Sequence, residues 1–145
     1  MRGKEKIEGP FRSANLLDVR FVGSTGMTQS DGSQKAIEVH IFPESMRGTG
    51  EGHYDWDLKP KSKMTNANVE QTVAGVDGQA LSVKYKGGEK KIVVTPETSV
   101  VTYVAGDRSD LKAGTKIFVA ATKQPDGTLQ TAPVTYGKDG LTPPM

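Results

Sequence analysis

Short runs of alternating apolar and polar residues, separated by glycine turns, most constrain the fold of this chain. Within residues 35–42, Ile37, Val39 and Ile41 share one side of an extended strand, as alternation with a period of two requires. Residues 80–85 repeat this pattern. The 17 glycines and 8 prolines favour many turns over long helices. The sequence therefore predicts an all-β protein.

Glycine-containing turns join the predicted strands. Asp31-Gly32, Asp77-Gly78, Gly87-Gly88 and Asp126-Gly127 are typical hairpin turns. Residues 109–114 predict one short helical turn that begins at Ser109 and ends at Gly114. The predicted strands span residues 19–27, 35–42, 69–76, 80–85, 90–95, 99–104, 115–122 and 128–136.

An internal repeat divides the chain. Residues 126–134 follow the pattern of residues 31–39 at a spacing of 95 positions. Each copy has an upstream Phe-Val pair, Phe21-Val22 and Phe118-Val119, and these pairs align if the first loop is two residues longer. The repeat predicts one complete unit near residues 67–139 and the closing hairpin of a second.

The complete unit resembles the bacterial DUF5666 family, small OB-like β-barrels without an assigned function. The resemblance is carried by residues 75–83, 91–95 and 109–114 and by the turn at 125–127. Residues 39–53 resemble a subgroup of exported alphaproteobacterial proteins with two such units. The resemblance implies a five-stranded OB-like barrel and a periplasmic or secreted location, and it implies no activity. The first unit here lacks its opening strands.

We therefore expect an all-β fold with a small five-stranded OB-like barrel, an extra N-terminal β-hairpin and a long Gly-rich connector. The hairpin is marginal alone, so we expect it to lie against the barrel or to pair with a second chain. The predicted divisions are a disordered N-terminus (1–14), the hairpin (15–43), the connector (44–66), the barrel (67–139) and a tail (140–145).

Composition excludes several functional classes. The 19 basic and 17 acidic residues nearly balance, which disfavours a nucleic-acid binder. The absence of cysteine excludes disulfides, thiolate nucleophiles, zinc fingers and iron–sulfur clusters. No apolar run approaches the roughly 20 residues of a membrane span. Residues 1–10 lack the apolar centre of a signal peptide, and we expect any leader to have been removed or left out.

The connector carries the residues with the most chemistry. His53 lies in it, and the chain's other histidine, His40, lies on the polar side of the preceding strand. Imidazole and carboxylate ligands suit a divalent transition metal, although no cofactor is required. The alternative is structural, with His53 and Trp56 folding the connector over a barrel end. The candidate metal ligands are His40, Glu44, His53, Asp55 and Asp57.

The preferred function is a non-enzymatic binding or structural module that recognises its ligand through the connector. The ligand-binding candidates are Arg47, His53, Tyr54 and Trp56. Gly48, Gly50 and Gly52 do not match a dinucleotide fingerprint and better suit a hinge or tight turns.

The same sequence leaves several further functions to weigh. A metal-binding protein is one alternative. Weak single-stranded nucleic-acid binding on an OB-like face is another, although the lysines at 84, 86, 90 and 91 are most simply a solvated face that discourages edge-to-edge pairing. A catalytic set is hard to assemble from two histidines, which disfavours an enzyme. A protein partner, or a second copy bound through the N-terminal hairpin, stays open.

Overall fold

The fold is all-β in a computed structural model that describes residues 2–6, 19–75, 78–105, 108–119, 121–130 and 134–137. The described residues contain no α-helix, and the two short 3-10 helices are η1 (Glu44–Met46) and η2 (Arg108–Asp110). The strands are β1 (Arg2–Lys6), β2 (Phe21–Thr28), β3 (Gln34–Ile41), β4 (Gly52–Asp55), β5 (Ser62–Gly75), β6 (Gly78–Tyr85), β7 (Gly88–Val94), β8 (Ser99–Ala105), β9 (Ile117–Phe118), β10 (Thr122–Lys123), β11 (Leu129–Gln130) and β12 (Thr135–Gly137).

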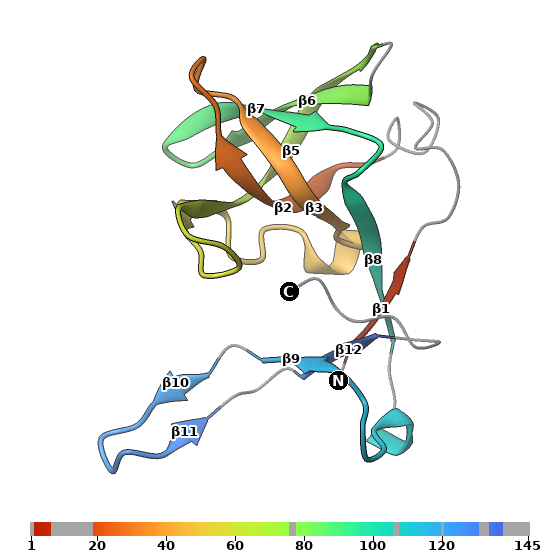
Figure 1. The fold of residues 1–145 in the computed structure, drawn as a ribbon, viewed down its shortest axis with the longest axis vertical. Coiled ribbons are helices and arrows are strands. Elements are labelled where there is room, and N and C mark those ends of the chain that lie inside the picture. The colour runs from red at the N-terminus through yellow and green to blue at the C-terminus, as the bar shows by residue number, and fades with distance from the viewer. Residues whose placement is uncertain are drawn as a thin grey trace. The chain divides into compact units, whose positions relative to one another are not determined.

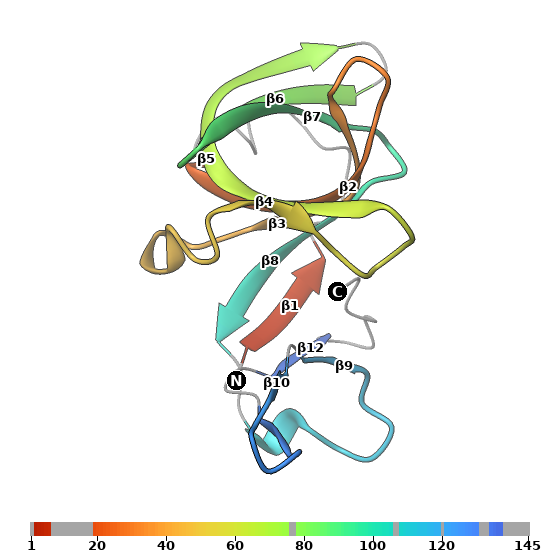
Figure 2. The same cartoon turned by 90° about the vertical axis from the view of Figure 1, so that its left-hand side faces the viewer.

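Two compact units make up the chain, and the larger one, Ile7–Thr102, holds a closed barrel. Its five strands follow the order β2-β5-β6-β7-β3, and pairing of β2 with β3 closes the circle (Figures 1 and 2). All neighbours are antiparallel except β3 and β7. This confirms the predicted five-stranded all-β barrel, and its mixed pairing is consistent with an OB-like fold.

The N-terminal hairpin belongs to this barrel and is not an extra element. β2 pairs with β5 from Phe21–Asn68 to Met27–Ser62, and β3 joins β7 through Gln34–Ile92 and Lys35–Val93. The sequence assigned barrel closure to the later hairpin, whereas only residues 67–102 of the predicted unit lie in the barrel unit. The prediction chose the wrong hairpin because the repeat gives both hairpins the same apolar pattern.

The length and bend of β5 allow five strands to enclose a core. It has 14 residues, pairs with β2 along its first half and with β6 along its second, and carries a bulge between Val69 and Gln71. A bulge strengthens the local bend and twist of a strand. The enclosed core consists of Val22, Ala36, Val39, Ala67, Leu81, Val83, Ile92, Val94 and Val100.

A second bulge changes the predicted inner face of β3. The register between β2 and β3 shifts between Thr25 and Gly26, so Ile37 is the additional residue. Ala36 therefore joins Val39 in the core, whereas the sequence placed Ile37 there. A bulge moves one residue out of the alternation, which a strict period of two cannot anticipate.

The predicted Gly-rich connector is more regular than expected. It contains η1 and β4, and β5 begins inside it at Ser62. β4 pairs antiparallel with β5 from Gly52–Asn66 to Asp55–Lys63. No signal in the sequence predicts β4, because this strand has no run of alternating apolar residues. It is held by backbone hydrogen bonds to β5.

The smaller unit comprises residues 1–6 and 103–145. Its β12 pairs in parallel with β1 and antiparallel with β9, while β10 and β11 form a separate ribbon. Arg2–Lys6, predicted to be disordered, is therefore a strand. Its partner, β12, lies at the other end of the chain, so the polar sequence of residues 2–6 gives no signal of the pairing. Residues 7–14 and the tail, 140–145, lie outside the described residues.

The helices in the described segments are single 3-10 turns. None has the length and hydropathy that crossing a bilayer requires.

Candidate functional site

β3 places His40 and Glu38 on the outer side of the barrel wall, opposite Val39. His40 Nδ1 and Glu38 Oε1 are 3.4 Å apart. Residue exposure is 2% for His40 and 0% for Glu38, so this polar side of the strand is covered. The imidazole also meets the ring of Phe42 edge-on, with centroids 4.8 Å apart. His40 is thus part of a packed outer layer.

Gly23 on β2 makes room for this imidazole. Gly23 is the Cα partner of both His40 on β3 and Asn66 on β5. A Cβ at Gly23 would overlap the His40 ring and the Asn66 side-chain oxygen. Asn66 Nδ2 in turn donates to the Thr49 carbonyl oxygen at 3.1 Å. The outer layer therefore ties three barrel strands to the connector.

His53 lies on the other side of the wall. β4 pairs it with Thr65, the neighbour of Asn66, so His53 and His40 face opposite sides. His53 Nδ1 lies 2.8 Å from Thr65 Oγ1, and the imidazole stacks on Tyr85 with centroids 6.1 Å apart. Thr65 is 1% exposed, so this hydroxyl is shielded from solvent. The pair fastens β4 to the barrel.

Burial lowers the pKa of His53 below its ordinary value of 6.5, and the positive charges of Lys90 and Lys63 lower it further. Asp55 acts in the opposite direction. The imidazole is therefore neutral at pH 7. A neutral ring can accept or donate one hydrogen bond at each nitrogen, which matches its pairing with a threonine hydroxyl.

We expect the free energy of unfolding to fall as pH is lowered from 7.5 to 5.5. The unfolded chain protonates residue 53 near pH 6.5 while the folded chain resists, so acid favours unfolding. His53→Gln should reduce this slope, because glutamine keeps a polar side chain but does not titrate. Urea unfolding of both proteins across this range measures the difference. Parallel pH profiles would contradict the prediction.

The other candidates make local contacts. Arg47 and Glu44 form an exposed ion pair, with Nε and Oε1 2.8 Å apart. Asp55 pairs with Lys63 across β4 and β5. The predicted metal ligands do not come together: in the described part of the chain, no three or more His, Cys, Asp or Glu residues are grouped to hold a metal ion. Asp57 is exposed.

Two aromatic candidates form a half-exposed pair on the connector. Tyr54 and Trp56 have ring centroids 6.2 Å apart in an edge contact. The Tyr54 hydroxyl donates to the Gly50 carbonyl at 3.0 Å, and this closes the glycine-rich turn on itself. Tyr54 remains 39% exposed. Part of the Tyr54 ring is therefore open to solvent, whereas the His53 ring packs against Tyr85 of the barrel.

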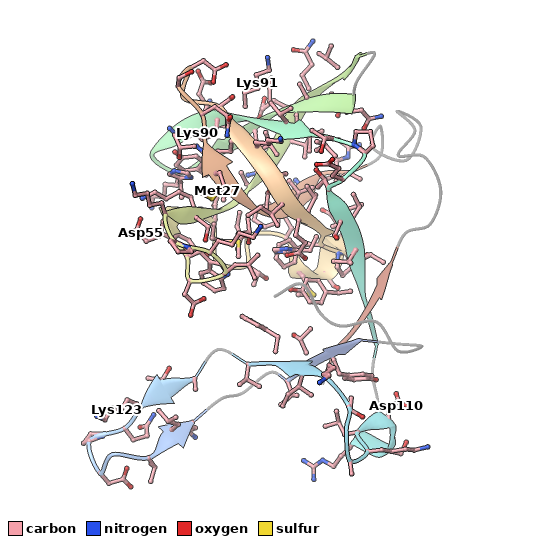
Figure 3. The ribbon with its side chains drawn as sticks, viewed as in Figure 1. Met27, Asp55, Lys90, Lys91, Asp110 and Lys123 are labelled. Carbon is pink, nitrogen blue, oxygen red and sulfur yellow. The ribbon has the colours of Figure 1, made fainter. Side chains whose placement is uncertain are left out.

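A surface groove, which the sequence did not predict, lies where the β2–β3 turn meets the β6–β7 hairpin. Parallel pairing of Gln34 with Ile92 brings this turn beside β7. The groove encloses about 460 Å³. Figure 3 marks two of its residues, Lys90 and Lys91, on β7. Its lining is Asp31, Gly32, Ser33, Ser82, Glu89, Lys90 and Lys91.

The turn that forms one wall of the groove is held by its own aspartate. Asp31 Oδ1 accepts hydrogen bonds from the Ser33 amide at 2.9 Å and from the Ser33 hydroxyl at 2.6 Å. These bonds lower the pKa of Asp31, and the positive charge of Lys91 contributes in the same direction. The wall therefore has a fixed shape and carries a negative charge next to a lysine.

No protein-family model, curated protein or solved structure matches this chain.

Proposed function

We propose that this protein is a non-enzymatic binding module that holds a polar ligand in the groove between the β2–β3 turn and the β6–β7 hairpin. The position of the groove carries the proposal. Barrels of the OB type bind oligonucleotides and oligosaccharides on the face of their second and third strands and under the adjoining loops. With β5 taken as the first strand of the meander, β6 and β7 are its second and third.

Charge on this face favours an anionic ligand. Lysines outnumber carboxylates on the strands and turns that surround the groove, and opposite charge steers and holds a ligand. The lining has no large apolar side chain, so hydrogen bonds and charges would carry affinity. The basic residues are Lys35, Lys84, Lys86, Lys90 and Lys91, and the acidic residues are Asp31, Glu38 and Glu89.

Single-stranded nucleic acid is a weaker candidate for the same groove. Proteins that bind single strands without sequence preference stack bases on aromatic side chains. The groove lining includes no aromatic residue, and Tyr85 stacks on His53. A compact or non-aromatic polyanion suits this surface better.

The half-exposed pair of Tyr54 and Trp56 carries a second candidate function, recognition of a protein partner through the connector. Tyrosine and tryptophan are enriched where proteins bind each other. Family membership and a periplasmic or secreted location are further proposals, and they rest on the sequence resemblance alone.

Titration with a short-chain polyphosphate, followed by calorimetry at about 50 mM and about 200 mM NaCl, tests the groove. We expect measurable binding that weakens with salt. Lys91→Ala should weaken it about tenfold, equivalent to about 1.4 kcal/mol. Lys123→Ala is the matched control, because it removes an exposed lysine in the smaller unit (Figure 3).

Equal affinity of Lys91→Ala and the parent protein would refute the groove as the site. Tighter binding of a decathymidylate than of polyphosphate would instead favour the nucleic-acid candidate. Tyr54→Ala should leave polyphosphate binding unchanged, because its ring belongs to the connector and not to the groove lining.

A further inference from the structure

Lys90 starts on the opposite face of β7 from its neighbour Lys91. Lys90 is the Cα partner of Val83, which faces the barrel core. Paired residues have their side chains on the same side of a sheet, so Lys90 starts on the core face and Lys91 on the outer face. Lys90 also lines the groove. In the view of Figure 3 it lies between Lys91 and Asp55. Lys90 therefore borders both the groove and the end of the barrel.

Two further basic side chains lie at this end of the barrel. Tyr85 packs against the core from β6, and its ring stacks on His53 of β4. His53 contacts the Thr65 hydroxyl on β5 through Nδ1. Lys63 lies two positions before Thr65 and therefore on the same face of β5. The barrel end thus brings His53 and Lys63 toward Lys90 on β7.

Electrostatics place these three groups within reach of one another. Burial lowers the pKa of His53 most, and the positive charges of Lys90 and Lys63 lower it further. Asp55 compensates Lys63 through an ion pair in which the aspartate side chain is 88% exposed. Among the residues that the structure describes, Lys90 forms no ion pair. The barrel end therefore carries a positive charge that no carboxylate of these residues neutralises.

His53 adds a hydrogen-bonding group to these charges. Its Nδ1 is engaged by Thr65, whereas Nε2 has no hydrogen-bond partner within the described part of the chain. When the Thr65 hydroxyl donates to Nδ1, the proton of the neutral ring lies on Nε2. Nε2 can then donate to an anionic oxygen. An anion at this end would meet two lysines and a ring donor.

We propose that the groove continues across Lys90 onto the barrel end, where Lys90, Lys63 and His53 form a second anion subsite, and that the ligand is an extended polyanion. The second subsite presupposes the groove as the first, so it rests on the proposed function. Lys63 is not part of the groove lining, so a short anion held in the groove does not reach it. A longer chain can occupy both subsites, and the second contact is then intramolecular.

Polyanion length and single substitutions test the extension together. Calorimetry at about 50 mM NaCl compares pyrophosphate with a linear polyphosphate of about ten phosphates. Lys63→Gln should weaken binding of the longer chain about fivefold, the upper range for an exposed ion pair, and should leave pyrophosphate binding unchanged. Asp55→Asn should strengthen binding of the longer chain, because it removes the carboxylate that competes for Lys63. Lys123→Gln in the smaller unit is the control and should change neither affinity.

The two histidines of the chain provide a spectroscopic readout. In proton–carbon NMR spectra, the ring signal of His53 should shift on saturation with the longer chain but not with pyrophosphate. The ring of His40, a residue that is 2% exposed, should keep its position and serve as the internal reference. A His53 signal that shifts equally with pyrophosphate would overturn the extension, because a short anion would then reach the barrel end.

The variants also separate failure of the extension from failure of the groove. Parental affinity of Lys63→Gln for the longer chain, with weaker binding by Lys91→Ala, would overturn the second subsite and leave the groove in place. Parental affinity in both variants would refute the groove and the extension together. Equal weakening by Lys63→Gln and Lys123→Gln would mean that overall charge, and not this subsite, holds the polyanion.

Discussion

Gly23→Ala is expected to lower the free energy of unfolding by about 3 kcal/mol, at the upper end of the usual cost of overpacking. The added methyl group would overlap the His40 ring and the Asn66 side-chain oxygen. Both of these residues are buried, so neither can move aside without disturbing the outer layer. Urea unfolding followed by circular dichroism measures the change through the transition midpoint.

A double-mutant cycle with His40→Ala tests the cause. Removing the imidazole opens the space that the new methyl group needs, so Gly23→Ala should cost less in the His40→Ala background. Contacting residues usually couple by about 0.5–3 kcal/mol. Additive effects of the two substitutions would show that the imidazole is not what excludes a side chain at position 23.

Alternation in the sequence identified the barrel strands because each has one face in the core. Leu81 and Val83 are buried on β6, as the period of two predicted. The choice of closing hairpin could not be predicted in the same way. Both hairpins carry the same turn, register and apolar spacing, so local pattern does not discriminate between them. That choice depends on pairing across the chain, with Gln34 beside Ile92 as the decisive contact.

The candidate site could be predicted only in part, because the type of a residue does not determine whether its side chain is buried or exposed. His53 and Trp56 were expected either to bind a ligand or to fold the connector over the barrel, and the stacking of His53 on Tyr85 matches the second expectation. The alternation placed His40 on the polar side of its strand, yet the side chain is buried there. The groove was missed because its walls come from segments that no local pattern connects, Asp31-Gly32-Ser33 and β7.

Gly78→Ala should be at least as damaging as Gly23→Ala, for a different reason. Gly78 begins β6 with φ near 140°, a conformation that side chains rarely adopt. A Cβ there would also overlap the Val94 carbonyl oxygen on β7. That oxygen is backbone, so relief requires the β6–β7 pairing itself to shift. We expect a loss of about 3 kcal/mol or more in the free energy of unfolding.

Gly87→Ala separates backbone strain from this collision. Gly87 has φ of 114°, but nothing lies within 4 Å of a Cβ placed there. Its substitution should cost about 1 kcal/mol through strain alone. Chemical unfolding of the two variants in parallel gives the comparison. Equal losses would mean that backbone conformation accounts for the whole effect at Gly78. A larger loss at Gly78 would show that the close approach of β6 to the Val94 carbonyl on β7, and not backbone strain alone, requires glycine at this position.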